Sequence, residues 1–204
     1  MISHIDPINN MTWKSPFITI DIDWAHNALI SDTIDLLEKN ETKATFFITH
    51  DTPLLDRLRS NKNFELGIHP NFNFLLEGNK CNGSSAEEVI DRLLNIVPEA
   101  KSIRSHSMFQ NSKLLDLFYE KGLRYDCNHY IPEQTNIILQ PWVLWNKLIR
   151  IPYFWEDDIY CKYDMALQFP KEEYTNDNAE AFLKNLKAFE TKIKEDAIAN
   201  SKDW

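Results

Sequence analysis

The stretch Phe17-Ile-Thr-Ile-Asp-Ile-Asp23 joins a short run of β-branched and aromatic residues to two acidic side chains. Such a run is typical of a buried strand. Apolar residues at spacings of three and four over residues 29–39 then predict a helix. The order repeats, since residues 44–49 predict a second apolar strand, residues 53–58 a helix and residues 64–68 a third strand. Strands that alternate with helices indicate parallel pairing in an α/β fold.

The same alternation continues downstream and limits the fold to a barrel or a doubly wound sheet. Ser85 followed by Glu88 forms a capping box ahead of a helix over residues 89–97. Asn111 can cap a further helix over residues 114–119. The later segments give the strands expected at residues 101–103, 125–127, 137–139 and 150–155, and the helix expected at residues 182–197.

The composition is that of an ordinary globular chain. Hydrophobic residues make up 43% of the 204 residues and charged residues 26%, which argues against disorder and against a membrane bundle. We expect a single domain over residues 1–204. The 22 Lys and Arg against 31 Asp and Glu give a net charge of −9, without a basic run. Nucleic acid is therefore not an expected partner.

Several classes of protein are disfavoured by features that the sequence lacks. No apolar stretch reaches the roughly 18 residues of a membrane span, and residues 1–16 do not resemble a secretory signal. The cysteines, at 81, 127 and 161, are too widely spaced for a disulfide framework or a C-x-x-C metal clip. No glycine-rich phosphate loop occurs, which argues against nucleotide-dependent enzymes. We expect a cytoplasmic protein without a membrane span.

Ionisable side chains follow the predicted strands, at the edge where parallel strands deliver reactive groups. Asp21 and Asp23 are two positions apart in an extended segment, so their side chains share a face. Neighbouring carboxylates need a cation to remain ionised. Together with imidazoles they favour a divalent metal, most of all Zn²⁺, with Mn²⁺, Fe²⁺, Co²⁺ or Ni²⁺ as alternatives. The other candidates at this edge are His50, His69, Arg104 and His106.

Four motifs in this order resemble those of the polysaccharide deacetylase family. They are the acidic strand end at Asp23, Ala44-Thr-Phe-Phe47, Glu65-Leu-Gly-Ile-His69, and Arg104 near the fourth strand. The resemblance covers residues 12–158 and implies an α/β fold, a distorted (β/α) barrel of about seven strands. It leaves residues 165–204 as an atypical C-terminal helical segment.

The resemblance also implies a role for each matching position. Asp21 corresponds to the catalytic base, and Asp23 and His69 to metal ligands. Arg104 corresponds to the arginine that orients the basic aspartate. Trp155 falls in the region where an aromatic residue lines the pocket for the acyl group, which makes it a candidate substrate-binding residue.

Two departures from the family pattern leave alternatives open. Asn73 stands where a second metal histidine is usual, and a neutral amide is a poorer ligand for zinc. His106 is the alternative third ligand. The family's late histidine, a general acid, has no counterpart because no histidine follows His129. His106, His129 or His50 can take its place, and His50 is also a candidate substrate-binding residue.

The resemblance predicts a metal-dependent hydrolase that removes an N-acetyl group from a sugar, in bacterial surface polysaccharide biosynthesis. The expected partner is a carbohydrate substrate. Two alternatives remain. One is an amidohydrolase that acts on a small non-sugar amide. The other is a glycan-binding protein that has lost catalysis, which the substituted metal position and the missing late histidine favour.

Overall fold

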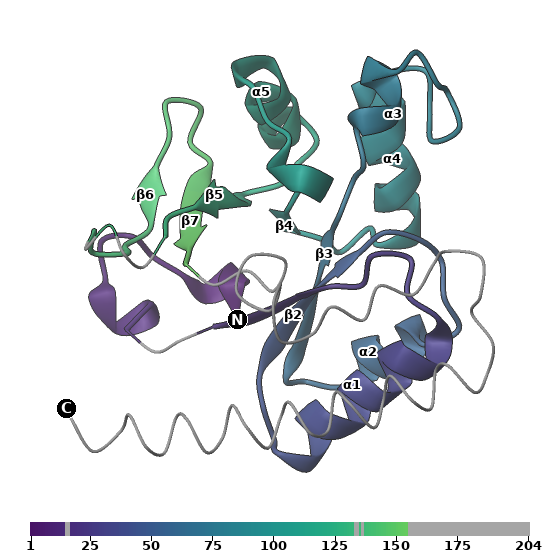
Figure 1. Cartoon of the computed structure of the whole chain (residues 1–204). Coiled ribbons are helices and arrows are strands. Elements are labelled where there is room, and N and C mark those ends of the chain that lie inside the picture. Colours follow the sequence, from purple (N-terminus) through teal and green to yellow (C-terminus); the bar gives the residue numbers. More distant parts are fainter. Residues whose placement is uncertain (15–16, 133–134, 136, 155–204) are drawn as a thin grey trace.

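The computed structural model describes residues 1–154 except 15–16, 133–134 and 136. Its centre is a seven-stranded sheet in the order β1-β2-β3-β4-β5-β7-β6 (Figure 1). Every neighbouring pair is parallel except β6 with β7. The strands are β1 (Ile18–Asp21), β2 (Ala44–Ile48), β3 (Phe64–Ile68), β4 (Ser102–Ile103), β5 (Tyr125–Tyr130), β6 (Trp142–Val143) and β7 (Ile149–Tyr153).

The seven strands and the mixed α/β class agree with the sequence prediction. Within the described residues the sheet is open, because β1 and β6 form its two ends and do not pair with each other. A closed barrel is therefore not seen in this part of the chain. The strand expected at residues 137–139 was wrong: Ile137 and Ile138 are exposed without strand pairing, and the strand that pairs with β7 is β6.

Three of the described α-helices begin at a residue whose side chain caps the helix. His26 Nδ1 accepts a hydrogen bond from Ala28 N at the start of the first helix. Ser85 and Asn111 cap their helices as predicted, with side-chain oxygens that accept from backbone N–H groups three residues on. The α-helices are α1 (Asn27–Lys39), α2 (Leu55–Ser60), α3 (Asn73–Leu76), α4 (Ala86–Ile96) and α5 (Ser112–Glu120), and the 3₁₀ helices are η1 (Ile2–His4), η2 (Asn10–Thr12) and η3 (His106–Met108).

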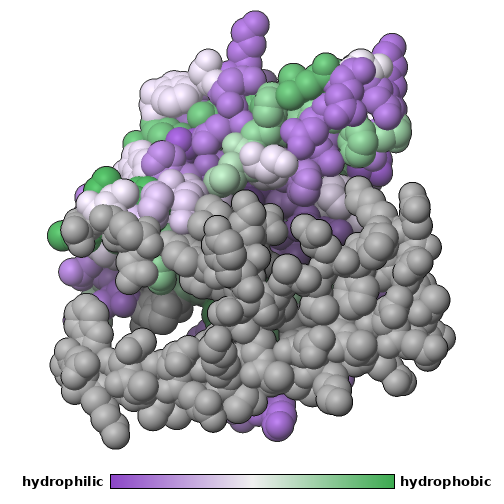
Figure 2. Space-filling model, viewed as in Figure 1, coloured by the Kyte–Doolittle hydropathy of each residue, from purple (hydrophilic) through white to green (hydrophobic). Residues whose placement is uncertain are grey.

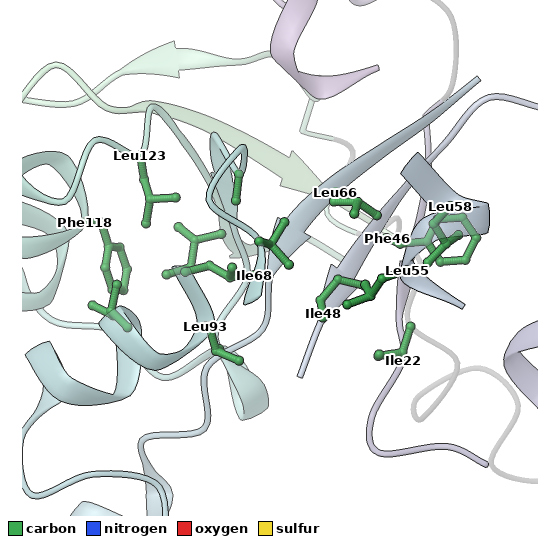
Figure 3. Packing of buried hydrophobic residues seen from close by; sticks show 14 of the residues in the cluster. Ile22, Phe46, Ile48, Leu55, Leu58, Leu66, Ile68, Leu93, Phe118 and Leu123 are labelled. Atoms are coloured by element: carbon green, nitrogen blue, oxygen red, sulfur yellow. The ribbon is translucent and has the colours of Figure 1, made fainter. Parts of the chain in front are cut away.

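The main core lies between the sheet and its helices. In β2 the side chains of Phe46 and Ile48 are fully buried and meet Leu55 and Leu58 of α2 (Figure 3). On the other face of the sheet, Phe47 packs in a smaller cluster with Ile2, Ile5 and Cys127. Alternate residues of β2 thus serve two different cores, and the N-terminal 3₁₀ segment covers part of the second one.

Gly67 explains why the Glu65–His69 motif contains a glycine. A Cβ atom at this position would lie 2.7 Å from the Phe47 ring and 2.6 Å from Ser102 Oγ. The ring of Phe47 occupies the space that a side chain would need, and the Arg104 guanidinium lies 4.8 Å from the centre of that ring. The glycine therefore allows an aromatic support beneath a site residue.

The visible described surface is largely hydrophilic (Figure 2). Hydrophilic residues cover much of the coloured part of the face in Figure 2, with apolar patches between them. Among the helices of the described residues, none combines the length and the hydrophobicity needed to cross a bilayer. The predicted helix over residues 182–197 and the segment 165–204 lie outside the described residues, so the single domain over 1–204 stays a prediction.

Candidate active site

Parallel register brings the site residues to one edge of the sheet. Asp21, the last residue of β1, pairs with Phe47, which pairs with Gly67. One step further along, the backbone N–H of His69 donates to Ile48 O at 2.8 Å, and that of Arg104 to Ile68 O at 3.1 Å. The carboxyl ends of β1 to β4 therefore present the predicted residues side by side.

Asp23 is the exposed member of a compact acid–imidazole cluster. Its Oδ1 atom lies 3.2 Å from His69 Nε2 and 3.4 Å from His106 Nδ1. Burial acts to raise the pKa of Asp23, but the two adjacent imidazoles outweigh it, so that the pKa is lowered from its ordinary value. The cluster thus holds a carboxylate between two imidazoles.

His69 is the residue of the site whose buried polar atoms lack hydrogen-bond partners among the described residues. Its side chain is 3% exposed, and neither ring nitrogen has a hydrogen-bond partner among the described residues. Nε2 is close to Asp23, yet the two groups are not arranged as donor and acceptor. Buried polar atoms are normally satisfied, so an orphaned imidazole indicates a missing ligand.

The donor set fits a divalent metal ion. One ligand atom each from Asp23, His69 and His106 lies within 4.8 Å of the others. One carboxylate and two imidazoles are ligands that zinc accepts readily, and a three-residue set leaves a position open for water or substrate. The structure thus brings His106 to the cluster, where the sequence left a choice between His106 and Asn73.

Asp21 lies beside the cluster but is bonded to a different partner. Arg104 Nη1 donates to both carboxylate oxygens of Asp21, at 3.2 and 3.3 Å, and Arg104 Nη2 donates to Thr19 Oγ1 at 2.8 Å. Asp21 Oδ1 is also 3.7 Å from His69 Nδ1. The arrangement separates an Arg-oriented carboxylate from the carboxylate that faces the imidazoles.

Arg104 is itself fixed on several sides. Its side chain is buried between the rings of Phe47 and Tyr153, with the guanidinium carbon 4.8 and 4.6 Å from their centres. Its Nε donates to Cys127 O at 3.3 Å. Burial acts against its charge, but Asp21 and other neighbours raise its pKa above the ordinary value. Arg104 is therefore a permanent, immobile cation behind Asp21.

Of the remaining predicted residues, two have hydrogen-bond partners outside Asp23, His69 and His106, and one is not described. Asn73 begins α3, and its amide nitrogen donates to Ser107 Oγ at 3.0 Å, which ties it to the loop after His106. His50 follows β2, and its Nδ1 lies 2.7 Å from Thr49 Oγ1. Trp155 lies outside the described residues. The roles predicted for these three residues stay predictions.

Most of the sequence matches one known protein family. A model of the WbmS-like polysaccharide deacetylases matches residues 18–190. The chain belongs to this family. The matched region begins at the first residue of β1 and continues past residue 158, into the segment that had looked atypical. The resemblance predicted from the four motifs is confirmed.

A solved relative supports the same assignment. The crystal structure from Bordetella bronchiseptica, assigned to a polysaccharide deacetylase involved in O-antigen biosynthesis, matches with a TM-score of 0.75 at 46% sequence identity. The match covers 83% of this chain and 70% of that chain. No curated protein matches the chain.

Sequence reasoning missed a second polar group of this deacetylase-family chain, which we call the strand-end network. Asp126 and Asn128 of β5, Arg150 of β7 and Gln110 form it. Arg150 Nε donates to Asp126 Oδ2 at 2.5 Å and Arg150 Nη2 to Gln110. Asn128 Nδ2 donates to Asp126 Oδ1 at 2.7 Å. The pairing of Asp126 with Arg150 depends on strand register, for which the sequence carries no motif.

The strand-end network is connected to the metal-ligand loop. Asn128 Oδ1 accepts from Ser105 N at 2.6 Å, and Gln110 Nε2 donates to Asn128 O at 2.7 Å. Ser105 stands between Arg104 and His106, so the network holds the backbone from which both side chains extend. Supporting groups of this kind commonly set the orientation of ligands and catalytic groups.

Proposed function

We propose that this chain is a metal-dependent hydrolase that removes an N-acetyl group from a sugar, in bacterial surface polysaccharide biosynthesis. Membership of a polysaccharide deacetylase family suggests a hydrolase that acts on C–N bonds. The observation that carries the finer proposal is the buried, unpartnered His69 beside Asp23 and His106. The O-antigen assignment of the Bordetella bronchiseptica relative supports the pathway.

Asp23, His69 and His106 would hold the metal. A divalent metal in such a site lowers the pKa of bound water and polarises a carbonyl oxygen. Zn²⁺ is the proposed ion because imidazole and carboxylate suit it. Asn73, tied to Ser107 in the loop after His106, is proposed to support the site or to add an amide oxygen to it.

Asp21 would accept the proton of the attacking water. It is close to the cluster, 3.7 Å from His69 Nδ1, yet bonded to Arg104 rather than facing the three ligand atoms. The Arg104 guanidinium donates to both oxygens of Asp21 and so fixes the orientation of the carboxylate, which a general base requires. Proton transfer to a general base typically contributes about 10²- to 10⁴-fold to the rate.

The leaving amine needs a proton from another group. Burial lowers the pKa of His50, and burial with nearby Arg150 lowers that of His129. At neutral pH each imidazole is therefore protonated in a smaller fraction of molecules than an ordinary histidine is, so a protonated donor is less often available. We expect slow turnover compared with an enzyme that carries a dedicated histidine acid. Trp155 and His50 remain candidates for contact with the substrate.

The proposed location is the cytoplasm. Cys81 and Cys127 are free thiols, one exposed and one buried, as in a reducing compartment. Burial strongly raises the pKa of the Cys127 thiol, which makes it unreactive.

The test separates metal binding from proton transfer. Purified protein would be assayed for bound divalent metal and for acetate release from N-acetylated oligosaccharides. We expect His69→Ala to lose both, and Asp21→Asn to keep the metal while losing acetate release. Equal metal content in wild type and His69→Ala would overturn the site assignment. Undiminished acetate release by Asp21→Asn would overturn the proposed base.

Two other outcomes would favour the alternative functions. A protein that binds metal and glycan but releases no acetate would instead be a glycan-binding relative of the deacetylases. A protein that releases acetate only from small linear or cyclic amides would be an amidohydrolase of another substrate class. The same acetate assay on both kinds of substrate distinguishes these outcomes.

A further inference from the structure

Asp23, His69 and His106 form what we call the ligand cluster. The loops that carry Asp23 and His106 both pass through the left-handed region of backbone conformation. Asp23 and Trp24 have φ values of 36° and 58°, and Ser107 and Met108 have values of 57° and 53°. Residues with a side chain rarely adopt this region, and a bulky side chain does so least readily. Such strain persists where the surrounding structure enforces it, and it concentrates at functional sites.

In both loops the strained pair ends in an exposed apolar side chain. Trp24 is 44% exposed and Met108 is 36% exposed. The neighbours of Trp24 are tightly held, since Ile22 is buried in the main core and Ala25 N donates to Ile22 O at 2.7 Å. Trp24 N donates to Thr49 Oγ1 at 3.3 Å. The backbone is thus anchored on both sides while the indole stays outside the core.

The indole of Trp24 lies next to the ligand cluster. Its ring contacts the His106 ring edge to face, with centroids 5.2 Å apart. The His106 ring contacts the His69 ring in the same manner at 5.5 Å. Three rings therefore form a continuous row that runs from the buried ligand outward to an exposed aromatic surface.

We infer that Trp24 is a specificity-determining residue that stacks against the sugar ring bearing the acetamido group. This inference rests on the proposed function. An exposed aromatic ring beside a polar reaction centre supplies an apolar surface for the C–H face of a pyranose. The acetamido group then reaches the cluster, which begins one ring away at His106.

Trp145 provides a matched control. It is 64% exposed, so it resembles Trp24 in residue type and accessibility. Its Nε1 atom donates to Asp116 Oδ1 of α5 at 3.1 Å. Its indole therefore has a structural partner in α5, and within the described part of the chain no hydrogen bond or ring contact joins it to Asp23, His69 or His106.

The experiment compares substrates with and without a sugar ring. The probes are a β-1,4-linked tetramer of N-acetylglucosamine and the ring-free amide N-acetylethanolamine, each assayed for acetate release by the metal-loaded full chain. We expect Trp24→Ala to raise KM for the tetramer about tenfold, with little change in kcat. KM for the ring-free amide rises much less, because that substrate has no sugar ring to stack on the indole. Trp24→Phe restores most of the loss, and Trp145→Ala behaves as wild type.

A binding measurement keeps the inference separate from the proposed function. Affinity for the tetramer is measured calorimetrically in the Asp21→Asn background, where no hydrolysis occurs. Loss of affinity on adding Trp24→Ala supports stacking even if wild type releases no acetate, in which case the proposed function alone fails. Equal effects of Trp24→Ala on both substrates, unchanged tetramer affinity, or no tetramer binding by the parent protein would overturn the inference.

Discussion

The ligand cluster and the strand-end network each contain a buried polar side chain, His69 in the first and Asp126 in the second. These two side chains differ in how completely their polar atoms are hydrogen-bonded. In the strand-end network, the Asp126 carboxylate is bonded to both Arg150 and Asn128. In the ligand cluster, both nitrogens of His69 lack a partner among the described residues. Burial alone therefore does not distinguish structural from functional polar residues. The unsatisfied group is the one that indicates a ligand.

The largest expected effect is on the strand-end network. Arg150→Met leaves the fully buried Asp126 carboxylate without its cation. Removal of one partner from a buried ion pair costs about 3–5 kcal/mol in the free energy of unfolding. Urea denaturation measures this loss. The double change Asp126→Leu with Arg150→Met is the control, and we expect it to recover much of the stability, whereas a fully destabilised double variant would contradict this account.

A smaller effect tests the connection between the two groups. Asn128→Ala removes the acceptor for Ser105 N, directly before His106. Metal affinity should fall about 10- to 100-fold, as is typical when supporting residues of a metal site are changed. Metal titration of the variant and wild type measures the change. Unaltered affinity would show that the network supports the fold without positioning the ligand.

Gly67→Ala tests the aromatic support beneath Arg104. The added methyl group would meet the Phe47 ring, so we expect a loss of about 1–3 kcal/mol in the free energy of unfolding. Thermal denaturation gives the value. Combining Gly67→Ala with Phe47→Leu should reduce the loss, because the smaller side chain vacates the space. Simple additivity of the two changes would argue against this contact.

The smallest expected effect concerns stability at the ligand cluster. In metal-free protein, His69→Leu removes an imidazole that has no hydrogen-bond partner among the described residues and whose contacts with Asp23 and Asp21 are to partly exposed carboxylates. The free energy of unfolding should therefore change by less than about 1 kcal/mol, or increase. Denaturation in the presence of a chelator measures it. A loss as large as that of Arg150→Met would show that His69 is a structural residue after all.

The sequence predicted the site better where residues are close along the chain than where strands must align. The extended segment that was predicted to place Asp21 and Asp23 on one face ends at Asp21, because Asp23 has a φ of 36°. The helix caps at Ser85 and Asn111 and the strands before His69 and Arg104 agree with the structure. These features follow from local periodicity and capping chemistry.

Features that depend on tertiary contacts could not be predicted from local sequence patterns. The contact of His106 with Asp23 depends on the left-handed turn at Ser107 and on the hydrogen bond from Ser105 N to Asn128. The Asp126–Arg150 pair depends on the register between β5 and β7. Residues 137–139 are apolar enough for a strand, yet pairing with β7 goes to Trp142–Val143 instead. Local sequence does not determine which strands pair or in which register, because strand formation depends on packing against neighbouring strands.

The ligand set is the central claim, and metal binding by paired variants tests it most directly. Zinc stoichiometry and affinity would be measured for wild type, His106→Ala and Asn73→Ala under identical conditions. The account predicts one zinc ion per wild-type chain, a loss of binding in His106→Ala, and a smaller effect in Asn73→Ala. Full zinc binding by His106→Ala, with loss of binding in Asn73→Ala, would contradict it.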